Sequence, residues 1–316
     1  MLTDSAYMHR ALQLASCGEQ GACPNPMVGA VLVSNATGLI VGEGYHRRCG
    51  GPHAEVWAIG NLRNLAHHTL YVTLEPCAHY GKTPPCARLI AERGVERVVV
   101  GCVDPFAKVR GRGIAILREA GITVDMIGGE QERLCIELNR KFFTAHTLHR
   151  PYVTLKWAQS ADGFIDRCRE PDEQPAAIST PLTRTLVHCV RSLHQTIAVG
   201  SRTELMDRPR LDVRLWPGGN TPRRVEFNRC EPLALRLQRL YHDGVISLLV
   251  EGGATLVNSF IQANLWDAIR VETSPMLIGA GTAAPTIPDK AVPDASYTIE
   301  SHTLKTYKNR SFCSLL

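Results

Sequence analysis

A histidine, a glutamate and two cysteines constrain this chain more than any other feature. The segment His53-Ala54-Glu55 precedes a second segment that contains Cys77 and Cys86. One imidazole and two thiolates give a zinc ion three ligands, and catalytic zinc sites keep the fourth position for water. Zinc lowers the pKa of that water toward about 7, and the resulting hydroxide can attack an amidine-like carbon. A carboxylate two residues after the histidine can carry the proton to departing ammonia.

The same residue types have other interpretations, which the sequence leaves open. A lone histidine is commonly a surface or core residue, and a lone cysteine behaves as a small buried hydrophobic side chain. The zinc site could also be a closed structural one, with His79 or a further cysteine as its fourth ligand. We favour a catalytic site because His-x-Glu followed by Pro-Cys and a second cysteine is typical of zinc nucleobase deaminases, whose glutamate is the general acid and base.

The spacing of the cysteines is wider than in the generic deaminase pattern. They stand at 77 and 86, so Gly81 and Pro84-Pro85 must form a loop that returns Cys86 to the metal. The segment T-L-E-P-C-A-H-Y-G-K-T-P-P-C resembles the deaminase half of the bifunctional pyrimidine deaminase/reductases of riboflavin biosynthesis, as do residues 24–29 and 42–46. The resemblance implies that His53, Cys77 and Cys86 bind zinc, that Glu55 shuttles the proton, and that Asn25, His46 and Lys82 contact the pyrimidine or its ribose phosphate.

Length and composition limit the remaining classes of protein. The chain has 316 residues, enough for two domains, and 44% of them are hydrophobic without an apolar run that could span a bilayer. The first residues lack the basic and apolar regions of a signal peptide. The 11 cysteines are therefore expected to be reduced thiols in the cytoplasm. A net charge of +5 suits an anionic small substrate, and we expect no nucleic-acid or membrane partner.

Residues 1–147 are predicted to form a three-layer α/β domain similar to that of cytidine deaminases. Apolar spacing indicates the helices, and short apolar runs indicate the strands. The predicted helices cover 6–16, 52–62, 86–92, 114–120 and 130–148, and the predicted strands cover 28–33, 39–44, 69–74, 97–102 and 122–127. Because Cys77 directly follows a strand, it falls at the carboxyl edge of the sheet, where open α/β sheets bind ligands.

A second domain, 150–316, begins at Arg150-Pro151 because proline ends the preceding helix. The motif from Lys156 to Gly163 resembles the opening of the family's reductase half, a dihydrofolate-reductase-like α/β fold that uses NADPH. The resemblance continues in a loop predicted over 203–207 and in the residues up to Arg214. It also includes Glu251-Gly252-Gly253-Ala254-Thr255. It implies substrate contacts from Lys156, Leu211, Arg214 and Glu251, with Arg214 holding the phosphate, and cofactor contacts from Gln159, Thr203, Asp207, Gly253, Ala254 and Thr255.

Three departures predict that this reductase domain is shortened and divergent. Pro175, Ala176 and Ala177 replace the family's Ser-x-Trp-Ile segment, and Arg229 replaces its serine after a strand. Only residues 229–246 separate Asn228 from the strand that precedes Glu251. We therefore expect at least one strand to be missing from the nucleotide side. A monofunctional deaminase with an inactive, structural second domain is the alternative.

The sequence thus predicts two successive reactions in riboflavin biosynthesis. Zinc-dependent hydrolysis would remove the 2-amino group of 2,5-diamino-6-(5-phosphoribosylamino)pyrimidin-4-one, and NADPH would then reduce the ribosyl side chain to ribityl. A deaminase of nucleic acid or free bases is a weaker hypothesis, because it needs a groove for flanking nucleotides that the sequence does not indicate. A scaffold protein with a structural zinc is weaker still. The resemblance also implies a homo-oligomer assembled through the second domain.

Overall fold

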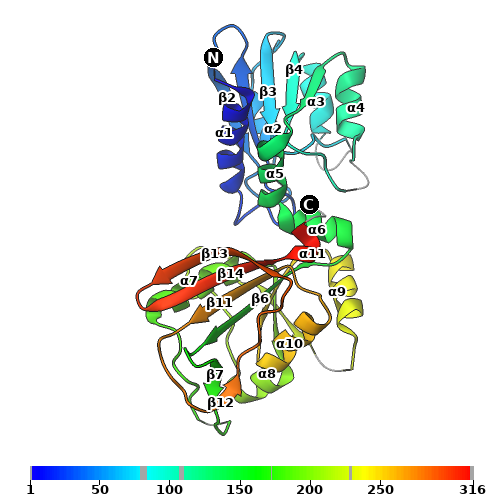
Figure 1. The fold of residues 1–316 in the computed structure, drawn as a ribbon. Helices are drawn as coiled ribbons and strands as arrows, with labels where there is room; N and C mark the ends of the chain where they lie inside the picture. Colours follow the sequence, from blue (N-terminus) through cyan, green and yellow to red (C-terminus); the bar gives the residue numbers. More distant parts are fainter. Residues whose placement is uncertain (1, 79–83, 107–109, 172, 228–229, 314–316) are drawn as a thin grey trace. The chain divides into compact units, whose positions relative to one another are not determined.

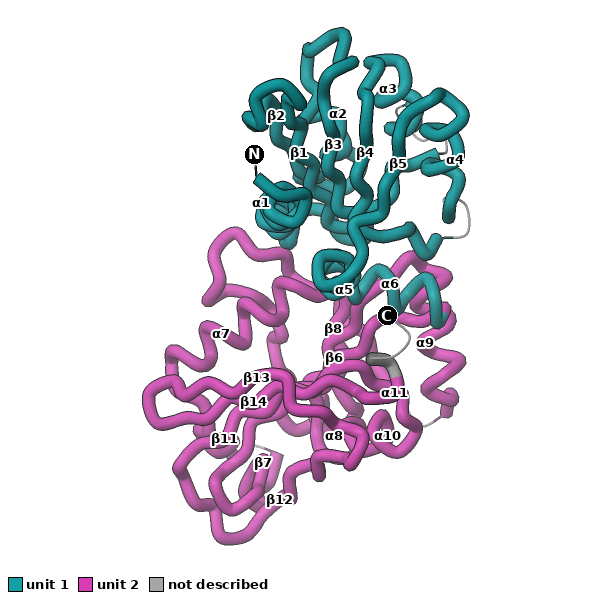
Figure 2. Tube along the Cα trace, turned by 45° about the horizontal axis from the view of Figure 1, so that its top comes forward, with its two compact units in different colours: residues 1–148, 316 teal, residues 149–315 magenta. Residues whose placement is uncertain are grey.

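A computed structural model shows two compact units, Met1–Leu148 and His149–Leu315. Figure 1 traces the elements along the chain, and Figure 2 colours the two units separately. The structure describes residues 2–78, 84–106, 110–171, 173–227 and 230–313. None of the helices in these ranges has the length and apolar character needed to cross a membrane.

The first unit is built on a five-stranded sheet with the order β2-β1-β3-β4-β5. The strands are β1 (Gly29–Ser34), β2 (Ile40–Tyr45), β3 (His68–Val72), β4 (Arg97–Val100) and β5 (Thr123–Met126). β1 pairs antiparallel with β2 and β3, whereas β3, β4 and β5 run parallel. All five strands lie where the apolar runs predict them.

Helices cover both faces of this sheet, which confirms the three-layer prediction (Figure 1). On one face α2 (Ala54–Ile59), α3 (Cys86–Glu92) and α4 (Arg112–Glu119) pack into the core through Ala58, Ile90 and Leu117. On the other face lie α1 (Asp4–Ser16) and α5 (Gly129–Leu138). α1 approaches β1 so closely that a Cβ at Gly29 would lie 1.9 Å from the backbone oxygen of Ala11, so only glycine fits there.

The single helix predicted over 130–148 is wrong, because the segment forms two helices, α5 and α6 (Arg140–Leu148). The break falls at Asn139. Its side-chain amide donates to the backbone oxygen of Met27 at 2.8 Å and accepts from the N–H of Met27 at 2.8 Å. The asparagine thus holds the loop that precedes β1, at the cost of helix continuity.

The second unit is built on a seven-stranded sheet with the order β13-β14-β11-β6-β10-β8-β9. Its strands are β6 (Tyr152–Gln159), β8 (Thr196–Gly200), β9 (Arg223–Phe227), β10 (Ser247–Glu251), β11 (Ala268–Thr273), β13 (Ala291–Ile299) and β14 (His302–Asn309). β9, β8, β10, β6 and β11 run parallel, and β14 and β13 are antiparallel. A separate small sheet pairs β7 (Phe164–Arg167) with β12 (Gly281–Ala283).

Helices also lie on both faces of this second sheet. α9 (Leu233–His242) and α10 (Ala254–Gln262) bury Leu237 and Phe260 against Val250 and its neighbours. α7 (Pro181–Ser192) packs Val190 against Leu249 on the opposite face. The short α11 (Arg310–Cys313) follows β14. The prediction of a loop over 203–207 is wrong, because these residues form α8 (Ser201–Asp207), a stretch that contains helix-favouring Arg, Glu, Leu and Met.

The prediction that the second domain has lost a strand is also wrong. β9 stands at one edge of the sheet, in parallel register with β8. α9 begins at Leu233, only a few residues after β9 ends, and the next strand begins at Ser247. Residues 229–246 are therefore enough, because most of them belong to the one helix that returns the chain to β10.

The second unit depends on a buried ion pair next to its first strand. Arg150 donates to the two carboxylate oxygens of Asp267 at 2.6 and 2.8 Å, and the N–H of Val153 donates to the same carboxylate at 2.7 Å. The side chains of Arg150 and Asp267 are 8% and 2% exposed. Loss of either partner would leave the other charge buried.

We predict that Asp267→Ala lowers the free energy of unfolding of the second unit by about 3–5 kcal/mol, because it leaves the Arg150 guanidinium without its counter-ion. Asp294→Ala is the matched control, because Asp294 pairs with Lys308 at a more exposed site, and its effect should stay below about 1 kcal/mol. Chemical unfolding followed by tryptophan fluorescence measures both, since Trp157, Trp216 and Trp266 all belong to this unit. Equal losses for the two variants would contradict the prediction.

Candidate active sites

His53, Cys77 and Cys86 meet at one point of the first unit. Nδ1 of His53 lies 3.5 Å from Sγ of Cys77 and 3.4 Å from Sγ of Cys86. The three ligand atoms all lie within 4.8 Å of one another. Zinc–sulfur bonds of about 2.3 Å and zinc–nitrogen bonds of about 2.0–2.1 Å set the ligand atoms of a tetrahedral site roughly 3.5 Å apart. The observed separations therefore fit a single zinc ion.

Helix starts and a strand end position these three ligands. His53 is the N-cap residue of α2, and Cys86 is the first residue of α3. Cys77 follows β3 after a short turn, and its Sγ accepts the backbone N–H of Cys86 at 3.2 Å. The hydrogen bond from the Cys86 thiol lowers the pKa of Cys77 to about 4. The pair therefore offers a thiolate, which is the form that binds metal.

Glu55 lies in the first turn of α2, and the residue is 3% exposed. Its Oε2 atom is buried and accepts no hydrogen bond from the described residues. Burial raises the pKa of this carboxyl. A buried carboxylate oxygen without a partner, beside three zinc-type ligands, fits a metal-bound water as its missing donor. Among the described residues no fourth metal-binding side chain joins the group, and His79 lies outside them.

The structure also brings Asn25 and His46 to this place. Nδ2 of Asn25 lies 3.1 Å from Nε2 of His46, and Nδ1 of His46 lies 3.1 Å from the backbone oxygen of Pro52. The rings of His46 and His53 meet edge to face, with centroids 5.2 Å apart. The Pro52 oxygen can only accept and the Asn25 amide nitrogen can only donate, so Nδ1 of His46 donates and Nε2 accepts. Burial lowers the pKa of His46. Lys82, the third predicted contact, lies outside the described residues.

Glu75 is a residue of this site to which the sequence interpretation gave no role. Its carboxylate is buried and accepts four backbone N–H groups, from Asp104 at 3.3 Å, Gly111 at 2.9 Å, Gly113 at 2.9 Å and Ile114 at 3.3 Å. It ties the turn that carries Cys77 to the start of α4. No pattern in the sequence indicates this role, because all four donors are backbone groups.

In the second unit, Lys156 and Glu251 lie side by side on β6 and β10. Arg191 of α7, which the sequence interpretation missed, donates to both carboxylate oxygens of Glu251 at 2.9 and 2.7 Å. Burial lowers the pKa of Lys156. Although burial acts in the opposite direction, Lys156 and Arg191 lower the pKa of Glu251. Two of the predicted substrate residues thus share one charged cluster with Arg191.

The other two predicted substrate residues lie on the loop after α8. Leu211 is 5% exposed and belongs to a small core with Ile197 and Leu249. Arg214 is exposed, and its guanidinium donates to Asp212 at 2.5 Å. The backbone oxygen of Asp212 in turn accepts from Arg191 at 3.2 Å, so the loop ends beside the charged cluster. The structure does not bring the guanidinium of Arg214 into contact with Lys156 or Glu251.

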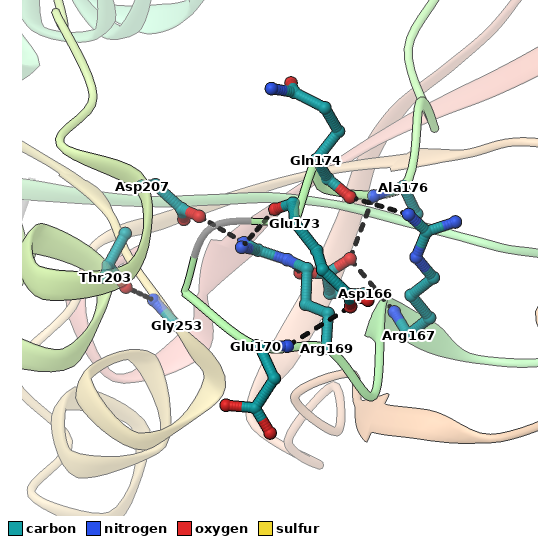
Figure 3. A network of polar contacts seen from close by, with 10 residues as sticks. All are labelled: Asp166, Arg167, Arg169, Glu170, Glu173, Gln174, Ala176, Thr203, Asp207 and Gly253. Carbon is teal, nitrogen blue, oxygen red and sulfur yellow. Dashed lines mark hydrogen bonds and ion pairs between the residues drawn. The ribbon is translucent and has the colours of Figure 1, made fainter.

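The predicted cofactor residues form a second group. Thr203 Oγ1 accepts the backbone N–H of Gly253 at 2.9 Å, as Figure 3 shows. Gly253 is the N-cap residue of α10, and Ala254 and Thr255 form its first turn. Gln159 ends β6 and accepts from the indole of Trp157 at 2.7 Å. Asp207 turns instead toward Arg169, which also pairs with Asp166 (Figure 3).

Comparisons with known proteins agree with both halves of this structure. Residues 1–102 match the family model of the cytidine and deoxycytidylate deaminase zinc-binding region, and residues 151–231 and 232–311 match that of the RibD C-terminal domain. The riboflavin biosynthesis protein RibD of Aquifex aeolicus is 36% identical over 88% of this chain and 88% of its own length. That of Escherichia coli is 33% identical over 88% of this chain and 89% of its own.

The chain belongs to the RibD family. Members of this family are enzymes of riboflavin biosynthesis that join a zinc-binding deaminase domain to an NADPH-dependent reductase domain. Among solved structures, RibD of Acinetobacter baumannii superposes with a TM-score of 0.88 at 30% identity, covering 97% of this chain and 98% of that one. The prediction of a shortened reductase domain is therefore wrong, because the whole RibD C-terminal domain is present.

The solved structure from Thermotoga maritima gives the same result with a more explicit name. It is described as a diaminohydroxyphosphoribosylaminopyrimidine deaminase/5-amino-6-(5-phosphoribosylamino)uracil reductase. It superposes with a TM-score of 0.84 at 32% identity, over 97% of this chain and 98% of that one. The predicted fold, a cytidine-deaminase-like domain followed by a reductase domain, is confirmed.

For the metal site, we predict that Cys86→Ala lowers the affinity for zinc by at least roughly a hundredfold, because it removes one of three ligands. Cys49→Ala is the control, since Cys49 is an exposed free thiol. Zinc bound per chain is measured by elemental analysis after dialysis against graded concentrations of a chelator. Unchanged zinc retention in Cys86→Ala would exclude this residue as a ligand.

For Glu75, we predict that Glu75→Gln lowers the free energy of unfolding of the first unit by about 2 kcal/mol. The amide nitrogen of glutamine would face backbone N–H groups that need an acceptor. Glu119→Gln, at the exposed end of α4, should change it by less than about 0.5 kcal/mol. Thermal unfolding followed by circular dichroism compares the two variants. A Glu75→Gln protein as stable as Glu119→Gln would show that the four N–H groups do not need the carboxylate.

Proposed function

We propose that residues 1–147 of this RibD-family chain hydrolyse the 2-amino group of 2,5-diamino-6-(5-phosphoribosylamino)pyrimidin-4-one, and that residues 150–316 then reduce the ribosyl side chain to ribityl with NADPH. The printed description of the Thermotoga maritima relative supports this choice of substrates. The observation that carries the proposal is the convergence of His53, Cys77 and Cys86 beside the unpartnered carboxylate of Glu55.

In the first step, His53, Cys77 and Cys86 would hold zinc, which when bound supplies an activated water. Oε2 of Glu55 would take up one proton and pass it to the departing amino nitrogen. Its raised pKa suits this role, because a carboxyl that exchanges protons works best with a pKa closer to neutrality. Asn25, neutral His46 and Lys82 would hold the pyrimidine and its ribose phosphate.

In the second step, bound NADPH supplies the hydride, and the protein aligns the opened sugar with it. Lys156 and Glu251 would contact the reacting part of the sugar, and Leu211 and Arg214 would contact its remainder. Gln159, Thr203 and Asp207 would contact the cofactor. Ala254 and Thr255 would offer backbone N–H groups to a cofactor phosphate at the start of α10. Gly253, whose own N–H donates to Thr203, would let the phosphate approach the backbone.

We also propose that the protein is cytoplasmic and that it forms a homo-oligomer. Cys17, Cys49 and Cys102 of the first unit form no disulfide, which is compatible with a reducing compartment. Assembly through the second domain follows from the family resemblance, and light scattering during size-exclusion chromatography measures it.

The proposal is tested by assaying the two half-reactions separately on the same purified protein. Glu55→Gln should keep its zinc and lose deamination by at least about a hundredfold, because the proton carrier is gone, yet it should reduce the supplied deaminated intermediate at the normal rate. Lys156→Met should show the reverse pattern. Glu92→Gln, an exposed substitution, serves as control for both reactions. Full deamination by zinc-loaded Glu55→Gln would overturn the first assignment, and no NADPH oxidation by the unmodified protein would overturn the second.

A further inference from the structure

The segment that joins β7 to α7 contains a buried arginine at the place where the chain departs from its family. Pro175, Ala176 and Ala177 stand in place of the family's Ser-x-Trp-Ile segment. Their side chains offer a ligand neither a hydrogen-bond donor nor an aromatic ring. In the same segment the side chain of Arg169 is only 4% exposed, although its nearest neighbours along the chain are exposed.

The guanidinium of Arg169 is buried because all three of its nitrogens have acceptors. Nε donates to Asp166 at 2.5 Å, and Nη1 donates to the backbone oxygen of Glu173 at 3.0 Å. Nη2 donates to Asp207 of α8 (Figure 3). Asp166 also accepts the backbone N–H of Ala176 at 2.9 Å, which folds the segment around the guanidinium. The bond to Asp207 therefore joins this folded segment to a predicted cofactor residue.

The position of α8 depends on polar contacts of this kind. None of its residues is buried, so packing into the core does not fix the helix. Thr203 accepts the N–H of Gly253, at the start of α10, at 2.9 Å. Glu204 pairs with Arg224 of β9. The ion pair of Asp207 is the corresponding contact at the carboxyl end of the helix.

The two predicted cofactor residues of α8 lie on one side of the helix. Thr203 and Asp207 are four positions apart, and such residues are neighbours on a helix surface. Arg169 binds Oδ1 of Asp207, and the side chain of Asp207 stays 30% exposed. Its other oxygen can therefore accept from a hydroxyl group of a ligand. NADPH is an anion that an unpaired carboxylate would repel, and the guanidinium compensates this charge.

We propose that Arg169 is a positioning residue for NADPH, which holds the carboxylate of Asp207 in the orientation that accepts from the cofactor. The inference rests on the proposed reductase function, in which Thr203 and Asp207 contact the cofactor. Arg169 acts through Asp207 and does not contact the reacting sugar. In this way the segment after β7 takes part in cofactor binding without the side chains of the Ser-x-Trp-Ile motif.

Calorimetric titration of NADPH into the full chain tests this role without turnover. Arg169→Met removes the donors, and we expect it to raise the dissociation constant of NADPH at least about tenfold. Arg169→Lys keeps the charge but cannot bridge Asp166 and Asp207 together, so it should recover only part of the affinity. Arg167→Met is the matched control. Arg167 is exposed and donates to the backbone oxygen of Gln174 at 2.9 Å, and its loss should change the constant by less than about twofold.

A double variant tests whether Arg169 acts through Asp207. Asp207→Asn alone should weaken NADPH binding, because the amide no longer pairs with the guanidinium. Adding Arg169→Met to Asp207→Asn should then raise the dissociation constant by less than about twofold more, since the shared interaction is already lost. Multiplication of the two separate effects would overturn the proposal, because Arg169 would then act independently of Asp207.

Steady-state kinetics distinguish positioning from a general structural role. In Arg169→Met the KM for NADPH should rise with the dissociation constant, while the KM for the deaminated intermediate and the rate of deamination stay unchanged. Equal rises in both KM values would assign the residue to general stability of the second unit. An unchanged dissociation constant in Arg169→Met would overturn the proposal. So would tighter binding, because the ion pair would then compete with the cofactor for Asp207.

Failure of the reductase function is distinguishable from failure of this inference. If the unmodified protein binds NADPH but oxidises none with the deaminated intermediate, the proposed function fails, and the dissociation constants still decide the role of Arg169. Normal NADPH oxidation with equal binding by the unmodified protein and Arg169→Met overturns the inference alone. An unmodified protein that binds no NADPH overturns both.

Discussion

The bond lengths of a zinc ion fix how far apart its ligand atoms can lie, and much of the first unit serves this requirement. His53 caps α2 and Cys86 begins α3 on the same face of the sheet, and Cys77 follows the end of β3. The three ligand atoms therefore converge only when α2, α3 and β3 are all correctly placed. Glu75 holds the turn next to Cys77 by binding four backbone N–H groups on the other side of the site. The same packing buries Glu55, whose Oε2 atom has no hydrogen-bond partner among the described residues.

The sequence predicts the parts of this arrangement that depend on residue type and order. Ligand chemistry limits a metal site to a few side chains, so His53, Cys77 and Cys86 stand out without a structure. The five strands of the first unit are equally visible, because each is a short apolar run. The break at Asn139 and the role of Glu75 are not visible, because their partners are backbone groups far away in the sequence. Periodicity along one segment carries no information about such partners.

The second unit shows a different limit of sequence interpretation. A short interval between Asn228 and β10 suggests a missing strand, but the number of residues does not show how they are used, and a single helix makes the return. Arg191 escapes notice because its partner Glu251 lies on another element. Only the register of β10 and β6 shows that Glu251 and Lys156 lie side by side. These charges, like the zinc ligands, become interpretable once the elements that carry them are placed.

The account depends on a zinc ion with an open position beside Glu55, and a crystal structure of the zinc-loaded protein tests this most directly. We predict one ion bound by Nδ1 of His53 and by Sγ of Cys77 and Cys86, with a water as fourth ligand in hydrogen-bond contact with the Glu55 carboxylate. A fourth protein side chain that closes the coordination sphere, or Glu55 itself bound to the metal, would contradict the account, because neither arrangement leaves a water and a free carboxylate together.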